Sequence, residues 1–147
     1  MFGRLFKRFQ PRTVQDPVFG ELTNDKHGNW SGTIAFTPLG KKIDIIIRLT
    51  PETPPSHEHR DFYGQIVDRW PDIHERLRGT LFEDLDDWED GTTMDKLFES
   101  LNFDAFSFWD LDARPRNWEI SATTPLDDHI FGIMMKDFDH DGFRMDG

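Results

Sequence analysis

Residues 56–88 read SHEHRDFYGQIVDRWPDIHERLRGTLFEDLDDW, and their apolar side chains recur at the spacing of an α-helix. At about 100° per residue these side chains fall within one arc of about 140°. They are Tyr63, Ile66, Val67, Trp70, Ile73, Leu77, Leu81, Leu85 and Trp88. The pattern predicts one long helix with an apolar face, and Thr53 or Ser56 is the expected N-cap. Pro71 predicts either a kink or two abutting helices.

Segments typical of β-strands lie on both sides of this helical stretch. Their apolar residues alternate with polar ones, and turn residues separate them. The predicted strands are residues 16–22, 30–36 and 43–49 before the helix, and residues 103–111, 117–124 and 129–136 after it. A capping pattern at residues 92–95 predicts a second, short helix.

This order of elements predicts an α+β fold. We expect an antiparallel sheet of about six strands, three before the helices and three after them, with the long helix packed on one face. Residues 16–147 are expected to form one domain, and residues 1–15 a basic amphipathic extension.

The composition is that of a folded, cysteine-free protein. The chain has 147 residues, of which 36% are hydrophobic and 14% aromatic, enough for a substantial core. The lack of cysteine excludes disulfides, thiolate metal sites and cysteine nucleophiles. Since no run of 18 apolar residues and no secretion signal is present, we expect a cytoplasmic location.

Charge is unevenly distributed along the chain. The net charge is −11, yet the first twelve residues contain Arg4, Lys7, Arg8 and Arg12 and no acid. An apolar stripe accompanies these basic residues, so the segment could lie on an anionic membrane or dock on its own domain, and docking is the favoured interpretation. The acidic remainder should repel nucleic acid and attract a basic partner.

The most uneven stretch is residues 83–112, where eleven acids stand against Lys96 alone, a local charge of −10. Aromatic rings are interleaved with these acids. Rings could anchor a basic protein while carboxylates steer its approach, or the rings could be core and the acids a solvated face. The candidate partner-binding residues are Asp84, Asp86, Asp87, Trp88, Glu89, Asp90, Asp110 and Asp112.

Motifs for metal binding and catalysis are incomplete. Residues 137–142, DFDHDG, match the first six positions of a calcium loop, which makes Asp137, Asp139 and Asp141 weak candidates as ligands. The bidentate Glu that such a loop needs would be residue 148, so an acidic turn is expected, with no metal and no cofactor. Neither a nucleophile elbow nor a phosphate loop is present, so no catalytic residues are predicted.

Two short motifs carry a family resemblance. Residues 16–20 read DPVFG and residues 30–32 read WSG, followed later by WEI at residues 118–120 and an Asp- and Gly-rich strand region at residues 137–147. Over residues 16–147 the chain resembles a group of small bacterial domains of unknown function. These have an Asp-Pro-x-x-Gly entry strand, a Trp-x-Gly second strand, a central helical insertion and a terminal strand pair rich in Asp and Gly. Some members occur in toxin-immunity or phage-associated settings, and the resemblance implies no catalytic residues.

Together these features predict a non-enzymatic acidic domain that binds a basic toxin or effector as an immunity-type inhibitor. Two alternatives stay open. One is a domain that senses a small ligand or calcium, and the other is an enzyme with unrecognised carboxylate chemistry.

Overall fold

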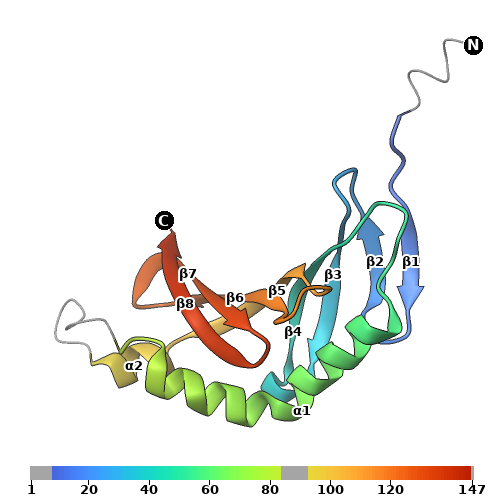
Figure 1. Cartoon of the computed structure of the whole chain (residues 1–147). Coiled ribbons are helices and arrows are strands. Elements are labelled where there is room, and N and C mark those ends of the chain that lie inside the picture. The colour runs from blue at the N-terminus through green and yellow to red at the C-terminus, as the bar shows by residue number, and fades with distance from the viewer. Residues whose placement is uncertain (1–7, 84–92, 147) are drawn as a thin grey trace, which may run out of the picture.

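The computed structural model describes residues 8–83 and 93–146, and its strands form one sheet (Figure 1). The strands lie side by side in chain order. They are β1 (Thr13–Asp16), β2 (Gly20–Asn24), β3 (Asn29–Phe36), β4 (Lys41–Arg48), β5 (Asn102–Asp110), β6 (Asn117–Thr124), β7 (Asp127–Lys136) and β8 (Asp139–Asp146). The helices are α1 (His57–Thr80), α2 (Met94–Glu99) and the 3-10 turn η2 (Thr37–Leu39).

The predicted α+β fold with a six-stranded antiparallel sheet is wrong. The sheet is an 8-stranded mixed sheet, and with one main helix the fold is predominantly β. Strands β4 and β5 run parallel, whereas every other neighbouring pair is antiparallel. The parallel pair arises because α1 and α2 carry the chain across the sheet before it re-enters beside β4.

Two strands, β1 and β8, lie outside the six that the alternation of apolar residues predicted, and both belong to tight hairpins. Asp16 was predicted to begin a strand, but its Oδ2 accepts hydrogen bonds from the backbone N–H groups of Val18 (2.9 Å) and Phe19 (2.8 Å). This turn ends at Gly20, whose φ of 74° favours glycine, and it joins β1 to β2. The acidic stretch from Asp137 likewise becomes the β7–β8 turn and strand β8.

Helix α1 begins at the predicted cap. The Ser56 hydroxyl accepts from the His59 N–H, and the Ser56 N–H donates to His59 Nδ1 (3.0 Å), so the N-cap prediction for Ser56 is confirmed. Pro71 lies inside one continuous helix, so the alternative of two helices is wrong. The helix ends at Thr80, earlier than the predicted apolar stripe, and residues 84–92 lie outside the described part of the chain.

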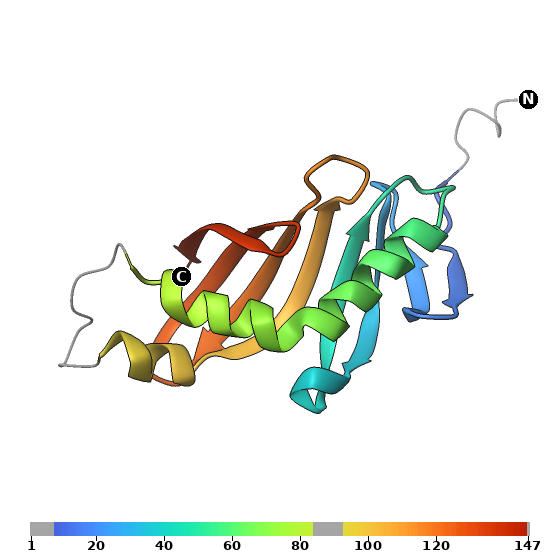
Figure 2. The same ribbon diagram turned by 60° about the horizontal axis from the view of Figure 1, so that its bottom comes forward.

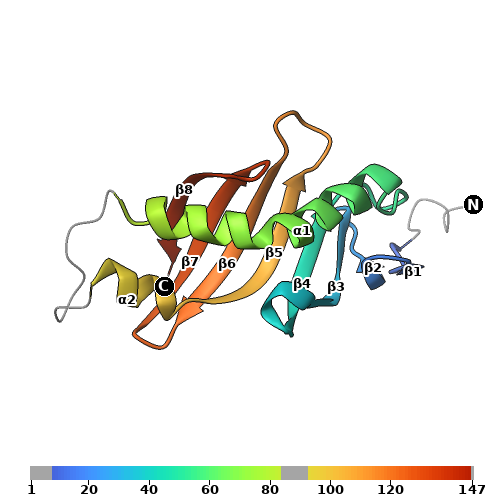
Figure 3. The same cartoon turned by 90° about the horizontal axis from the view of Figure 1, so that it is seen from below.

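Helix α1 lies across one face of the sheet, with its axis crossing the strands (Figures 2 and 3). Its buried side chains, which include Phe62, Ile66, Trp70 and Leu77, share one core with side chains from β3 to β7. The helix therefore packs against strands on both sides of the parallel β4–β5 pair. None of the helices within the described residues is long and apolar enough to cross a bilayer.

Candidate functional site

The opposite face of the sheet has no helix over it among the described residues, and it lies above the strands in Figure 1. Its side chains are mostly small or polar, because they alternate with the core residues of each strand. We call it the open face; its central residues are Ser31, Thr33, Ala105, Ser107, Ser121 and Gly132. Three large apolar side chains on it are exposed: Trp109 (41%), Ile130 (48%) and Met134 (39%).

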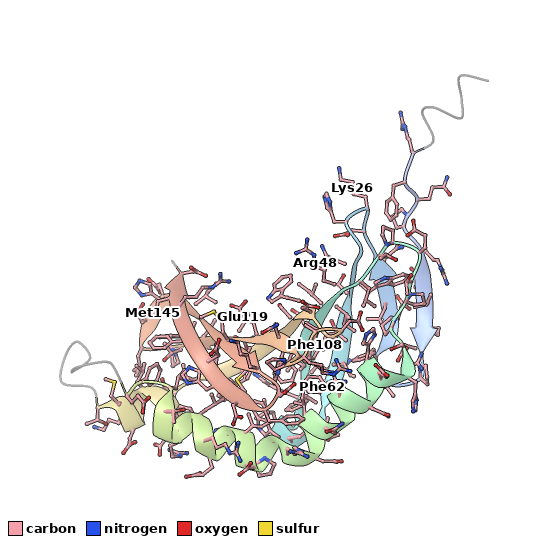
Figure 4. The ribbon with its side chains drawn as sticks, viewed as in Figure 1. Lys26, Arg48, Phe62, Phe108, Glu119 and Met145 are labelled. Atoms are coloured by element: carbon pink, nitrogen blue, oxygen red, sulfur yellow. The ribbon has the colours of Figure 1, made fainter. Side chains whose placement is uncertain are left out.

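A buried carboxylate holds the exposed tryptophan in place. The Glu119 side chain is only 9% exposed; its Oε2 accepts a hydrogen bond from Trp109 Nε1 (3.2 Å), and its Oε1 forms an ion pair with Arg144 Nη2 (3.0 Å). Gly132 lies beneath the Glu119–Arg144 pair, where a side chain would collide with both. Glu119 is labelled on the open-face side of the sheet in Figure 4, while Phe62 and Phe108 lie toward the helix. Trp109 is thus an exposed ring with a fixed orientation.

A hollow of about 340 Å³ adjoins Trp109. It lies where β4 and β5 end and α1 begins, so two parallel strands present their carboxyl ends to it. In open sheets, ligands bind at such ends because the connecting segments diverge and leave a crevice. The lining residues are Arg48, Leu49, Thr50, Thr53, His59, Trp109 and Asp112, and below we call it the strand-end hollow.

A larger hollow of about 670 Å³ lies over β2, β3 and β4 on the open face. It is a broad depression lined mainly by short side chains such as Thr23, Ser31 and Thr33. The strand-end hollow is smaller, but it brings together more different polar groups, so it is the better candidate for specific recognition.

His59 is the buried polar residue of the strand-end hollow. Its Nδ1 accepts the Ser56 N–H, so in the neutral ring the proton is on Nε2, which donates to Asp112 Oδ1 (2.9 Å). The His59 side chain is 5% exposed, whereas that of Asp112 is 72% exposed. The pair connects the first turn of α1 to the segment after β5 and fixes where the Asp112 carboxylate lies.

This geometry is poorly suited to general base catalysis by His59. Both ring nitrogens already have partners, so neither is free to take a proton from a hydroxyl in the hollow. The hydroxyl of Thr50 donates to that of Thr53 (2.8 Å) rather than to the histidine. What the arrangement offers is a set of positioned hydrogen-bonding groups.

Most of the predicted partner-binding residues cannot be placed. Asp84, Asp86, Asp87, Trp88, Glu89 and Asp90 lie outside the described residues. Asp110 and Asp112 are described: Asp110 is the last residue of β5, and Asp112 follows two residues later and lines the strand-end hollow. Asp112 therefore lies at the same hollow as the exposed ring.

The three weak metal candidates each have another partner. Asp137 Oδ1 accepts the Arg116 N–H, Asp139 pairs with Arg76, and Asp141 pairs with Lys136 (3.4 Å). Within residues 8–83 and 93–146, no three side chains of metal-ligating type come close enough to hold an ion.

The sequence did not single out Arg48, Glu119 or Arg144. Unlike these three residues, Trp109 could have been recognised from its neighbours in the sequence. It follows Phe108 in a strand, and two consecutive rings must face opposite sides of a sheet. Since Phe108 is buried, at 1% exposure, its neighbour has to lie on the other face. Glu119 and Arg144 come from different strands and meet only through register, which no local pattern reveals.

No protein-family model, curated protein or solved structure matches this chain. The resemblance to the group of bacterial domains therefore stays a prediction.

Proposed function

We propose that this protein is a non-enzymatic domain that binds a basic protein through the open face around Trp109, as an immunity-type inhibitor does with its toxin. The observation that carries the proposal is the exposed indole held by Glu119. Tryptophan is among the residues most often responsible for binding energy, and a ring that is already oriented loses little freedom when a partner covers it.

Charge supports a basic partner. The chain has a net charge of −11, Asp112 lines the same hollow as Trp109, and Asp110 follows Trp109 in β5. Carboxylates beside an apolar anchor would speed the approach of a positively charged surface and orient it. The same negative charge opposes binding to nucleic acid, because it repels the phosphates. We place this binding in the cytoplasm, because a cysteine-free protein needs no oxidising compartment.

The experiment is to capture partners on the immobilised protein, purify the protein that is bound, and measure its affinity by calorimetry for matched variants. Trp109→Ala is expected to weaken binding at least tenfold, because it removes the anchor. Trp109→Phe keeps a ring but loses the Glu119 contact, so an intermediate loss is expected. Val18→Ala is the control, since Val18 is equally exposed (40%) but lies in the β1–β2 turn.

Charge is tested separately. The double variant Asp110→Asn, Asp112→Asn should slow association at low salt, and the difference should shrink at high salt. The same measurement on a variant with Asp86, Asp87, Glu89 and Asp90 replaced by Asn and Gln tests the rest of the predicted surface. Equal affinities for Trp109→Ala and Val18→Ala would show that the partner docks elsewhere.

A further inference from the structure

The strand-end hollow contains two opposite charges that do not pair with each other. The Arg48 side chain forms no hydrogen bond or ion pair with any described residue, although Arg48 lines the hollow. Asp112 lines the same hollow and uses Oδ1 for His59, which leaves Oδ2 without a partner among the described residues. Unpaired opposite charges at one hollow favour a ligand that carries both signs.

The residues between these charges fit the rest of such a ligand. The Trp109 ring and the Leu49 side chain supply apolar surface. Thr50 donates its hydroxyl hydrogen to Thr53, so the Thr53 hydrogen stays available for a negatively charged oxygen. A volume of about 340 Å³ is at the lower end of the range for small-molecule sites.

We infer that the strand-end hollow binds a zwitterion of the α-amino acid type with an apolar side chain. The ligand carboxylate is received by Arg48 and the Thr53 hydroxyl, its ammonium group by Asp112, and its side chain by the Trp109 ring. A simple anion is disfavoured by the Asp112 carboxylate, and a simple cation by the Arg48 guanidinium. His59 acts as a positioning residue, because its Nε2–H holds the Asp112 carboxylate beside the hollow.

This binding goes beyond the proposed docking of a protein and needs no partner protein. It is tested by calorimetry on the purified full chain with L-phenylalanine and L-leucine. The matched probes are phenethylamine, which lacks the carboxylate, and 3-phenylpropionate, which lacks the amine. We expect saturable binding of at least one amino acid, and at least tenfold weaker binding of both single-charge analogues of L-phenylalanine if that amino acid binds.

Variants test which residues of the strand-end hollow bind the amino acid. Arg48→Gln and Asp112→Asn should each weaken amino acid binding at least tenfold, and the asparagine oxygen can still accept from His59, which protects the fold. Lys42→Gln is the matched control: Lys42 lies on the same strand and face but does not line the strand-end hollow. It should leave affinity unchanged.

Three outcomes would overturn the inference: no saturable binding of either amino acid, analogues that bind as tightly as L-phenylalanine, or an Arg48→Gln variant equal to Lys42→Gln. None of them bears on protein docking, which is read from the affinity of the captured partner for Trp109 variants. Conversely, if the Trp109 variants bind the captured partner normally, the amino acid titrations still test the strand-end hollow.

Discussion

At the scale of single residues, Tyr63 is the clearest conflict between burial and polarity. It is 4% exposed, and its hydroxyl has no hydrogen-bond partner among the described residues. A buried hydroxyl without a partner costs about 1–3 kcal/mol of stability. Tyr63→Phe removes only that oxygen, so we expect the free energy of unfolding to rise by about 1 kcal/mol, measured by urea denaturation.

Burial of Tyr63 also predicts a loss of stability at alkaline pH, and this loss provides a control for the Tyr63→Phe prediction. Burial raises the pKa of Tyr63 from 10.0 to about 12. The folded state therefore keeps the neutral phenol when the unfolded state ionises, so this part of the stability is complete below pH 10 and is lost between pH 10 and 12. The Tyr63→Phe variant should lack this loss. A variant that is less stable than the parent at neutral pH would show that the hydroxyl is hydrogen-bonded after all.

Gly132 tests whether the buried Glu119 carboxylate holds Trp109. A Cβ at Gly132 would collide with Glu119 Oε1 and lie 2.9 Å from Arg144 Nε. Since Glu119 is nearly buried, Gly132→Ala should displace it from one of its partners and lower the free energy of unfolding by about 1–2 kcal/mol. Denaturation measures that loss, and a shift in tryptophan fluorescence would report the freed Trp109 ring.

The same substitution in helix α1 should have the opposite sign. Nothing lies within 4 Å of a Cβ at Gly64, and alanine favours the helix by about 1 kcal/mol. Gly64→Ala should therefore stabilise the protein while Gly132→Ala destabilises it. If both variants stabilise, the Glu119–Arg144 pair can move aside and does not fix the tryptophan.

At the scale of elements, helix α1 was predictable because its signals are local. Its apolar period and the Ser56 cap can be read from neighbouring residues. The continuity through Pro71 could not be read in this way, since a helical proline costs about 3 kcal/mol. Burial of Trp70 (3% exposed) and Ile73 (0%) on either side of Pro71 supplies the tertiary packing that offsets this cost.

The β1–β2 and β7–β8 hairpins were harder to predict, because the sequence of one turn resembles a strand and that of the other resembles a loop. Asp16 and Gly20 bound a turn in which the aspartate side chain replaces backbone partners, and a proline at the second position hides it within an apparent strand. At the other end, the acidic stretch after Asp137 is read as a loop by composition. As β8 it is an edge strand, where alternating charge is normal.

His74 gives helix α1 a predictable response to acid. Burial lowers the pKa of His74, and the nearby Arg78 lowers it further, while Glu75 opposes them. Its ring lies 5.0 Å from that of Phe98 and 5.9 Å from that of Phe103, so charging it disturbs an aromatic cluster. The folded state binds the proton less readily, so stability is complete above the unfolded pKa of about 6.5 and falls as the pH drops below it.

His74→Phe keeps the ring and removes the titration. We expect its free energy of unfolding to fall less than that of the parent protein when the pH is lowered from 7 to 5, as measured by urea denaturation at each pH. His57→Gln is the control, because it removes a histidine from the same helix whose side chain is 83% exposed. Identical pH profiles for His74→Phe and the parent would show that His74 is not the responsible group.

At the scale of the whole molecule, the architecture depends on one fact that local patterns do not contain. Strand β5 re-enters the sheet beside β4, so two antiparallel halves join through a parallel pair. That junction creates the strand-end hollow and brings Arg48 and Asp112 into its lining. The sequence could predict most strands and the acidic charge, but not which strand ends meet, because pairing partners are set by long-range packing.

Helix α1 is expected to make the two halves unfold as one unit, and Trp70 is the residue that tests this. Its ring contacts Phe36 of β3 (5.1 Å) on one side of the junction, and Phe103 (5.4 Å) and Phe106 (5.8 Å) of β5 on the other. Trp70→Ala should cost about 3–5 kcal/mol. If the halves are coupled, native-state hydrogen exchange should accelerate equally in β3 and β7.

Trp109→Ala is the matched control for this prediction, because it removes an equally large ring from the open face, where Trp109 is 41% exposed against 3% for Trp70. It should cost about 1–2 kcal/mol, less than Trp70→Ala, and leave exchange in β3 almost unchanged. A Trp70→Ala variant in which only one half loses protection, or which unfolds in two separate transitions, would mean that the sheet consists of two independently stable halves joined by α1.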